Sequence, residues 1–527
     1  MKWLGRRTRR FWSAPSLGFD GAETGLEAIR NRVEVRRGQA LPHPDWLRSQ
    51  AEENVRRGAP ESLREKVATI SAGRGVVVLA GQQVALHGGP LYSIYKLITA
   101  TALAERLERE LEMPVLPVFW SVSDDADFGE VATSWLARPR GRLIKLRDKD
   151  LPPSGTRIGT LAAARQREVL NEHLAVLNDF PFGKEVLHRL DRIAAETENW
   201  VQFQTALFHQ ILSGTDVLIL DGGDPNLLAD VSPWLESVGA PDPLRRDLVA
   251  GAEVSRSLNL EPSFEPDLAE RALFRLSGDL RLSREGGPTA GPLAPNVVLR
   301  PLLQDYVLPN VATVCGPSEI RYRAQLGAVY RNRGVTEPLR IPRLSAVLLP
   351  TLAPHRQNGD LDEYLALLAD PKKYVQKQIE DEPVPEAEHE LVRLRELVRA
   401  GIGQLVPEFA QLDPSLPQLI ESAAGKSDYQ FERMLEAARG KRRQQLLKRE
   451  PTLAALTDWI RPRDREQERV LSALMPIWLE GWDAFDPTVE VARRSVESIL
   501  AGSGAGMEER EEIFLLDPIL ARVGVEG

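Results

Sequence analysis

The sequence predicts an α/β fold whose core is a parallel β-sheet, and three observations lead to this prediction. Short runs of Val, Ile and Leu are each bounded by Gly, Pro or Asp, which is typical of strands buried on both faces of a sheet. A helix with apolar residues three or four positions apart lies between the first two runs. A strand, a helix and a strand in this order form the unit of parallel sheets with right-handed crossovers.

The strands of this sheet are expected at residues 75–81, 115–122, 216–221, 296–299 and 311–315. In the helix between the first two strands, Tyr95, Ile98 and Leu103 belong to the apolar face. The charged residues at 105–110 mostly face away from the sheet.

The pattern of apolar and charged residues changes along the chain and predicts a core, an arm and a C-terminal stretch. The core is expected to span residues 1–374, with loop-rich insertions at about 130–200 and 236–294 that decorate the sheet. Residues 375–460 are expected to form the arm, and residues 461–527 are expected to pack back on the core.

The arm is predicted to be an antiparallel helical coiled coil. Apolar residues at heptad-like spacing form a narrow stripe from Leu391 to Phe409, with charged residues around it. Asp413 and Pro414 signal the cap and first turn of a second helix, which continues through Leu446. Because a narrow stripe needs a partner, we expect the first helix to pair with its own return helix or with a second subunit.

Composition excludes several classes of protein. The chain has 67 Lys and Arg residues against 76 Asp and Glu, a net charge of −9, which argues against general nucleic-acid binding. No apolar run is long enough to span a membrane. The single cysteine excludes an intrachain disulfide framework and suits the reducing cytoplasm, where we expect the protein. The seven histidines lack zinc-binding spacing, so no metal site is predicted.

The first strand runs into a glycine-rich turn that is a candidate anion site. The turn contains Gln82, Gln83, His87 and Gly88-Gly89, and the helix after it holds Lys96. Ligands of parallel sheets bind beyond the carboxyl ends of the strands, where glycines and helix N-termini admit an anion. His87 with its glycines faintly resembles the signature of class I nucleotidyl transferases. The alternative is a turn with one loop histidine and no role in binding.

The second strand ends in an aspartate cluster of Asp124, Asp125 and Asp127. Such a cluster accepts hydrogen bonds, holds a cation, or raises one pKa into the range of a general base. A solvated acidic turn is the alternative. At the third strand end, Asp224 before Pro225 is explained by capping of a helix.

Arg300 follows the apolar run 296–299, so it must pair with a carboxylate or with a ligand anion. Gly316 to Glu319 predicts another strand-to-helix turn that directs N–H groups at a site. An internal ion pair of Arg300 with Asp305 or with Glu319 is the alternative. Cys315 has no recognisable base and is expected to be a buried apolar side chain.

Taken together, these stretches resemble the cysteine-adding enzyme family of bacillithiol biosynthesis. The match runs in the same order over nearly the whole chain. It includes Gly81–Gln83, Gly89–Ser93 with Tyr92, Lys96, Pro117–Trp120, Asn296–Leu308 with Gln304 and Asp305, Gly316–Ile320, Tyr322, Ala324, Gln325, Pro342–Ser345 and Gln467–Val470.

The resemblance implies a Rossmann-like core related to nucleotidyl transferases, with connecting-peptide insertions and a coiled-coil arm used for homodimerisation. It also implies a reaction that joins the carboxyl group of cysteine to the amine of glucosaminyl-malate. The sequence departs from the family at Ala126 and Thr133, where the family has histidines, and at Cys315, where it has glycine. A nucleotide-binding scaffold without activity, or a ligase or nucleotidyl transferase for another amino sugar, are therefore alternatives.

Amide formation requires an activated carboxyl group, so we expect ATP to be consumed. Gln82, Gln83, Gly88-Gly89 and Lys96 are expected around a phosphate or a substrate carboxylate. Asp125 or Asp127 is expected to hold or deprotonate the amine, and Arg300 to bind the malate. The remaining candidates for binding are His87, Tyr92, Trp120, Asp124, Gln304, Asp305, Gly316 and Glu319.

Overall fold

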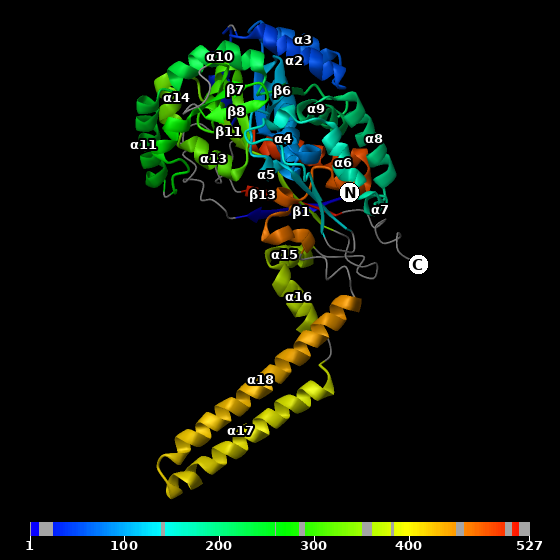
Figure 1. The fold of residues 1–527 in the computed structure, drawn as a ribbon, viewed down its shortest axis with the longest axis vertical. Coiled ribbons are helices and arrows are strands. Elements are labelled where there is room, and N and C mark those ends of the chain that lie inside the picture. Colours follow the sequence, from blue (N-terminus) through cyan, green and yellow to red (C-terminus); the bar gives the residue numbers. More distant parts are fainter. Residues whose placement is uncertain are drawn as a thin grey trace. The chain divides into compact units, whose positions relative to one another are not determined.

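The computed structural model describes residues 2–9, 25–39, 41–138, 143–258, 260–283, 290–349, 361–380, 384–449, 458–500 and 509–515. The chain forms two compact units (Figure 1). One unit contains residues 1–138, 143–351 and 462–527, and the other contains residues 139–142 and 352–461.

A parallel five-stranded sheet forms the centre of the first unit, with the strand order β11-β10-β2-β3-β6. The chain runs outward from β2 to β3 and β6, and then crosses back to β10 and β11. Two neighbouring strands, β2 and β10, thus lead away in opposite directions, which is the switch point at which parallel sheets bind ligands. The predicted parallel sheet is confirmed. The strands are β2 Val76–Gln83, β3 Val115–Val122, β6 Leu218–Asp221, β10 Asn310–Cys315 and β11 Leu339–Pro342.

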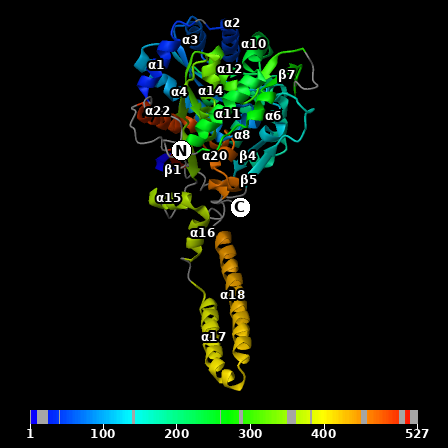
Figure 2. The same cartoon turned by 90° about the vertical axis from the view of Figure 1, so that its left-hand side faces the viewer.

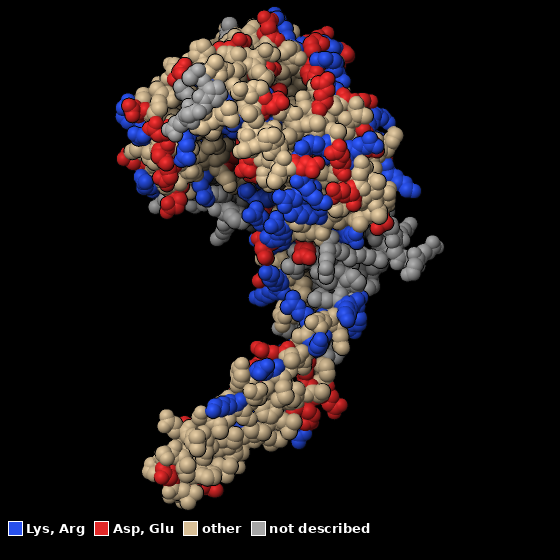
Figure 3. Space-filling view, viewed as in Figure 1, with Lys and Arg blue, Asp and Glu red and all other residues tan. Residues whose placement is uncertain are grey.

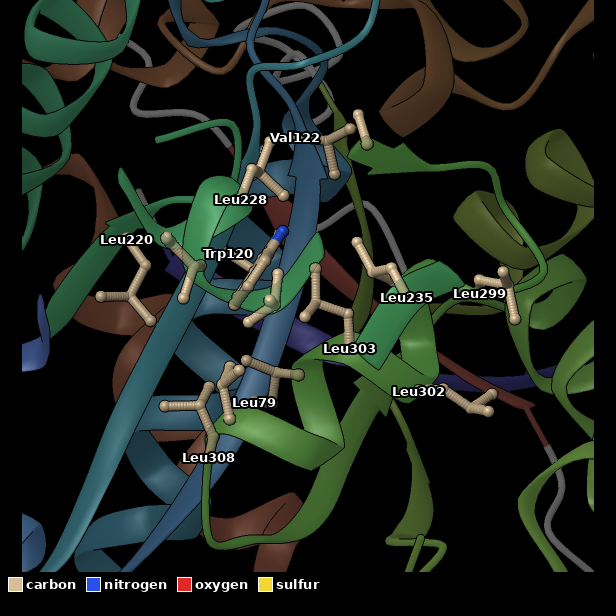
Figure 4. Close-up of a cluster of buried hydrophobic side chains, with 14 of the residues drawn as sticks. Leu79, Trp120, Val122, Leu220, Leu228, Leu235, Leu299, Leu302, Leu303 and Leu308 are labelled. Carbon is tan, nitrogen blue, oxygen red and sulfur yellow. The ribbon is translucent and has the colours of Figure 1, made fainter. Parts of the chain in front are cut away.

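Helices cover both faces of this sheet, which explains why β3 is buried along its whole length. On one face, Leu79 and Trp120 pack against Leu302, Leu303 and other side chains of the flanking helices (Figure 4). On the other face lies α4, which contacts β2, β3 and β10. The helices of this part of the chain are α1 Leu26–Arg36, α2 Pro44–Arg56, α3 Ser62–Ser71, α4 Leu91–Leu111, α12 Arg300–Val307, α13 Pro317–Ala324 and α14 Gly327–Arg333.

The strand predicted at residues 296–299 is wrong. The side-chain oxygen of Asn296 accepts the N–H groups of Val298 and Leu299, which bends the chain into a turn, and α12 then begins at Arg300. The apolar side chains of Val298 and Leu299 still enter the core. A short apolar run has the same pattern in a strand and in a buried turn, so periodicity could not separate the two. The other four predicted strands are confirmed as β2, β3, β6 and β10.

The segments between β3 and β6 and between β6 and β10 contain regular elements where the sequence indicated mainly loops. Asp224 caps α10 by accepting the N–H of Asn226, as predicted. The elements are α5 Phe128–Val131, β4 Thr133–Ala137, β5 Leu143–Arg147, α6 Ala164–Asn171, α7 Leu174–Leu177, α8 Gly183–Glu196, α9 Trp200–Ile211, α10 Pro225–Val238, α11 Pro241–Ser257, β7 Leu273–Ser277, β8 Leu280–Ser283 and β9 Leu293–Pro295.

A second sheet joins both ends of the chain. In it β13 Glu509–Leu515 pairs antiparallel with β1 Lys2–Arg9 and parallel with β12 Ser345–Leu349. The neighbouring helices are α20 Gln467–Val470, α21 Met475–Glu480 and α22 Asp486–Leu500. Both α20 and α22 contact α4, so the C-terminal stretch lies on the helix that follows β2.

A buried ion pair fastens α20 to the end of β11. Glu468 accepts two hydrogen bonds from Arg343, at 2.9 and 2.6 Å, and both side chains are 3% exposed. The same carboxylate accepts the hydroxyl of Ser345 and the N–H of Ala346. A charge buried this deeply is tolerated because every oxygen of the carboxylate has donors around it.

The second unit contains two long helices, α17 Glu386–Leu412 and α18 Leu416–Arg449, preceded by α15 Leu361–Ala369 and α16 Pro371–Glu380. The two long helices run antiparallel and lie side by side in both views (Figures 1 and 2). Arg395 of α17 pairs with Asp428 and Glu432 of α18. Much of the apolar stripe remains exposed, including Leu394 and Leu405. Within the described residues, no helix is long and apolar enough to cross a membrane.

Replacing Glu468 by Gln is expected to lower the free energy of unfolding by about 3 kcal/mol or more, because it removes the buried negative charge that accepts two hydrogen bonds from Arg343. The measurement is urea denaturation followed by tryptophan fluorescence. Glu105→Gln is the matched control: it removes one side of the exposed Arg493–Glu105 pair and should change the free energy by less than about 1 kcal/mol. The double replacement Arg343→Met with Glu468→Leu should recover much of the loss. Equal effects of Glu468→Gln and Glu105→Gln would contradict this assignment.

Candidate functional site

A cavity of about 410 Å³ opens at the carboxyl ends of β2 and β10, which is the switch point of the sheet. We call it the switch-point cavity. Its walls come from β2 and α4, from β3 and α5, from α12, from β10 and α13, and from the segments that hold Arg343 and Arg469. In the space-filling view, Lys and Arg side chains gather near α5 on the visible face (Figure 3).

The switch-point cavity brings together nine of the residues singled out in the sequence, although they come from distant parts of the chain. Because the carboxyl ends of parallel strands meet at one edge of the sheet, the turns after β2, β3 and β10 converge there. These residues are Gln82, Gln83, Tyr92, Lys96, Asp125, Arg300, Gln304, Gly316 and Glu319.

Lys96 connects three of the cavity walls. Its ammonium donates to the carbonyl of Gly81 at 2.8 Å and to the side-chain oxygen of Gln82 at 2.9 Å, and it pairs with Glu319 at 2.6 Å. An ammonium has three N–H donors, so these partners use all of them. Lys96 therefore positions Gln82 and Glu319 and retains no donor for a phosphate, in contrast to the prediction from the sequence.

Tyr92 presents a hydroxyl group that stays protonated. The amide of Gln82 donates to this hydroxyl at 3.0 Å. Burial, followed by the negative charge of Glu319, raises the pKa of Tyr92 to about 12. Because the hydroxyl oxygen already accepts a hydrogen bond, its proton is available to donate to a ligand.

Asp125 is held as a carboxylate. Burial alone would raise the pKa of Asp125, but the hydrogen bond from Gln83 and the charges of Arg300 and Arg281 outweigh it and hold this pKa below its ordinary value. The distances are 2.7 Å from the amide nitrogen of Gln83 and 3.2 Å from Arg281. An ionised carboxylate with a lowered pKa is suited to holding a cation and is a weak general base.

Arg300 lines the cavity and pairs with Asp124 at 3.3 Å. Neither ion pair considered from the sequence is formed. Asp305 is fully buried and accepts hydrogen bonds from Asn310 and Tyr330, while Glu319 pairs with Lys96. Both predicted pairs are absent because the partner of Arg300 is Asp124, which follows the end of β3 and lies far away in the sequence.

Three further arginines line the cavity, and the sequence analysis assigned none of them a role: Arg323, Arg343 and Arg469. Together with Lys96 and Arg300 they make five cationic side chains, against the three acidic side chains Asp125, Glu130 and Glu319. Positive charges thus exceed negative ones by two among the lining side chains, but Arg300, Arg323 and Arg343 pair with Asp124, Asp305 and Glu468, which lie outside the lining. Guanidinium groups that line a cavity are suited to carboxylate or phosphate groups.

Of the glycine-rich turn, Gln82 and Gln83 line the cavity, whereas His87, Gly88 and Gly89 do not. The N–H groups of Gly88 and Gly89 donate to the carbonyls of Ala85 and Leu86, so they are not directed at a ligand. A side chain at Gly88 would meet Leu207 and Phe208 of α9 at 3.0 and 3.1 Å, which explains the glycine by packing. The predicted phosphate cradle is therefore not formed by this turn.

His87 is buried in the same turn, away from the switch-point cavity. Its backbone N–H donates to the side-chain oxygen of Gln166, and its Nε2 lies 2.8 Å from the carbonyl oxygen of Gln166. Burial lowers the pKa of His87 to about 4, so the ring is neutral at physiological pH. This residue serves the packing of the turn, and the structure gives no support to contact with a phosphate.

Four other candidates lie outside the cavity. Trp120 is buried against Trp46, with ring centroids 6.2 Å apart. Asp124 lies behind Arg300, and Asp305 lies in the core. Asp127 is the N-cap of α5, where its carboxylate accepts the N–H of Glu130, so a direct role in holding an amine is not supported.

The carboxyl group with a raised pKa at this sheet edge is Asp221, where burial raises the pKa to about 6 and Ser123 donates a hydrogen bond. It does not line the cavity.

Cys315 is buried as predicted, and burial raises the pKa of its thiol to about 12. Among the residues that the structure describes, no group of three or more His, Cys, Asp or Glu side chains is arranged to hold a metal ion.

The sequence carried a usable signal for one of the residues that were missed. Asp127 and Glu130 have the spacing of a helix N-cap and its third residue, which places Glu130 on the first turn of a helix after the second strand. Arg343 and Arg469 lie in stretches that match the family, but no local pattern indicated that the fold brings these segments to this edge.

Comparison with known proteins identifies the family. The family model "Bacillithiol biosynthesis BshC, N-terminal Rossmann-like domain" matches residues 19–286 and 281–344. These residues are more than half of the chain, so the chain belongs to the BshC family of bacillithiol biosynthesis.

Relatives named "Putative cysteine ligase BshC" match over most of the chain. The relative from Solibacter usitatus (strain Ellin6076) is 29% identical, over 77% of this chain and 80% of its own. The relative from Salinibacter ruber (strain DSM 13855 / M31) is 28% identical, over 80% and 82% respectively. The relative from Bacillus cereus (strain ATCC 10987 / NRS 248) is 24% identical, over 88% and 91%.

A solved structure described as a putative arginyl-tRNA synthetase from Campylobacter jejuni matches with a TM-score of 0.23 and 10% identity. The match covers 85% of this chain and 98% of that one. A similarity this low carries no argument about fold or function.

The low pKa of His87 predicts how stability depends on pH. The folded pKa of about 4 lies below the unfolded value of 6.5, so the unfolded state binds a proton between these two values that the folded state does not. Stability should be complete above about pH 6.5 and fall as pH falls toward 4, and His87 contributes up to about 1.4 kcal/mol per pH unit. Urea midpoints measured at pH 7 and pH 5 should therefore differ less for His87→Asn than for the unaltered protein.

Burial also lowers the pKa of His209 to about 4. The matched variant His209→Asn should therefore show the same smaller dependence of stability on pH. Identical pH slopes for all three proteins would refute the burial of a neutral ring.

Proposed function

We propose that this protein is a ligase that joins the carboxyl group of cysteine to the amine of glucosaminyl-malate, with ATP consumed. Membership of the BshC family and the name of its relatives, "Putative cysteine ligase BshC", support the reaction class. The observation that carries the proposal is the switch-point cavity, whose lining contains both guanidinium groups and carboxylates. A substrate with malate carboxylates at one end and an ammonium group at the other has the complementary charges.

Arg300 is the side chain that we assign to the malate. Its Nη2 donates to Asp124 and to the carbonyl of Pro295, while its Nε and Nη1 have no partner within the described residues. A guanidinium with unused donors beside a cavity is suited to a carboxylate, because planar N–H groups and carboxylate oxygens match in pairs.

We assign two further roles in the reaction, to Tyr92 and to Asp125. The protonated hydroxyl of Tyr92 is suited to donate to an oxygen that gains negative charge when the amine attacks the carbonyl carbon. Asp125, held ionised by Gln83 and Arg281, adds negative charge on the side of the cavity that we assign to the amine.

ATP would supply the activation of the cysteine carboxyl group. The N–H groups of Gly88 and Gly89 bind carbonyls of their own turn, and the three donors of Lys96 are all used. Arg469 fits this purpose better: it lines the cavity, and its only partner within the described residues is Glu466. We therefore assign a phosphate-binding role to Arg469, with Arg300 kept for the malate.

Among the described residues no histidine lines the cavity, and the family histidines are replaced by Ala126 and Thr133 elsewhere in the chain. This observation favours a second candidate, a ligase that acts on a different amino sugar with carboxylates as its only titratable acceptors. A nucleotide-binding scaffold without catalytic activity is the third candidate.

Purified protein incubated with cysteine, ATP and glucosaminyl-malate should form a cysteine adduct detectable by mass spectrometry, with one ATP hydrolysed for each adduct. Replacing the acceptor with other amino sugars tests the second candidate. ATP turnover with only another acceptor would move the assignment to that sugar, and no turnover with any acceptor would favour the scaffold.

Arg300→Met should raise the KM for glucosaminyl-malate by about tenfold or more and leave the KM for cysteine nearly unchanged, because a bidentate contact to carboxylate is lost. Steady-state kinetics for each substrate in turn measure this. Arg275→Met is the control, since Arg275 bonds to Gly291 outside the cavity and should affect neither KM. Equal increases for both substrates would mean that Arg300 has a structural role.

We also propose that two chains associate through the arm, in the cytoplasm. Leu394, Leu397 and Leu405 of α17 remain exposed after α18 has packed against it, and a second copy would bury them. Light scattering should give the mass of a dimer for the unaltered chain. Leu397→Lys with Leu405→Lys should give a monomer with an unchanged circular dichroism spectrum. A monomeric unaltered chain would end this proposal.

A further inference from the structure

Glu130 differs from the other charged residues of the switch-point cavity in having no counter-charge. It lies on α5, immediately after β3, and its side chain lines the cavity. Within the described residues, its only side-chain partner is the amide of Gln83, at 3.1 Å. The other two carboxylates of the lining are paired: Asp125 with Arg281 and Glu319 with Lys96.

The amide of Gln83 fixes Glu130 beside Asp125. One nitrogen atom, Nε2 of Gln83, donates to Oδ2 of Asp125 at 2.7 Å and to Oε2 of Glu130 at 3.1 Å. The two carboxylates therefore lie on either side of one amide, and Arg281 neutralises only the first. The backbone N–H of Glu130 is bound by the Asp127 cap, which holds the start of α5 in place.

We propose that Glu130 binds the ammonium group of the acceptor substrate and thereby selects amine-bearing sugars in their cationic form. This inference rests on the proposed function and assigns a residue to its amine subsite. A carboxylate with one oxygen fixed by an amide and no cation beside it is an acceptor for an ammonium N–H. Arg300 and Glu130 line the same cavity and carry opposite charges, so they are suited to bind opposite ends of one substrate.

A divalent cation is the other chemistry that two neighbouring carboxylates suit. Mg²⁺ and Ca²⁺ need several oxygen ligands around one point. The described residues contain no group of three or more potential metal-binding side chains, so the geometry favours the ammonium.

The test compares two ligands on three proteins. The ligands are glucosaminyl-malate and the same compound with its amine acetylated, which removes the positive charge and keeps the malate. The proteins are the unaltered chain, Glu130→Gln and the control Glu168→Gln, which changes an exposed residue on α6. The Glu130→Gln side chain keeps an oxygen for the Gln83 amide and loses only the charge, so the variant is expected to fold.

Calorimetric titration at a pH where the amine is protonated should show that the unaltered protein and Glu168→Gln prefer the amine over its acetylated form by about tenfold, the value of one charge-assisted hydrogen bond. In Glu130→Gln the preference should fall to about twofold or less, while binding of the acetylated compound stays unchanged. In turnover, KM for the amine should rise and KM for cysteine should not.

The possible results distinguish a failure of the role assigned to Glu130 from a failure of the proposed substrate. A retained preference in Glu130→Gln overturns the role of Glu130 and leaves the proposed function intact. Absence of binding of both sugars to the unaltered protein overturns the proposed substrate and this inference together. Binding of Mg²⁺ alone, lost in Glu130→Gln and not in Glu168→Gln, would replace the ammonium with a metal ion and overturn the proposal.

Discussion

The buried ammonium of Lys96 is the constraint on which the arrangement of the site depends. It lies on α4 and joins the end of β2 to the first turn of α13 through Gly81, Gln82 and Glu319. Burying a single charge in this position is costly unless each N–H has an acceptor, so the three acceptors are held as a set. Through Gln82 this set orients Tyr92, and through Glu319 it occupies the N–H of Gly316. The charged atoms that remain available to a ligand are consequently those of other residues.

The charged side chains around the cavity therefore have two different roles, one structural and one in ligand binding. Lys96 and the Arg343–Glu468 pair use their hydrogen bonds within the protein and hold the walls together. Arg300 and Glu130 keep unused capacity and face the cavity. Charged side chains whose hydrogen bonds are all made within the protein stabilise the cavity walls. Charged side chains with unused hydrogen-bonding capacity determine which ligand the cavity binds.

The parallel sheet and the position of the site could be predicted from the sequence, because both follow from local patterns. Apolar runs bounded by turn residues located β2, β3, β6 and β10, and the polar residues that follow these strands converge in any parallel sheet. What could not be predicted was pairing between distant segments, such as Arg300 with Asp124. The roles of His87 and Asp127 also depended on such details: whether a turn residue faces a ligand or the core is set by its neighbours in space, here Gln166 and the start of α5.

One wall of the cavity is formed by chain that follows the long helices. Arg469 belongs to α20, and Glu468 beside it anchors Arg343. The cavity can therefore close only after the segment that follows the long helices has been made. Until then Arg343 lacks the carboxylate that accepts two of its hydrogen bonds. Formation of this cavity wall and formation of the Arg343–Glu468 pair thus depend on the same late segment.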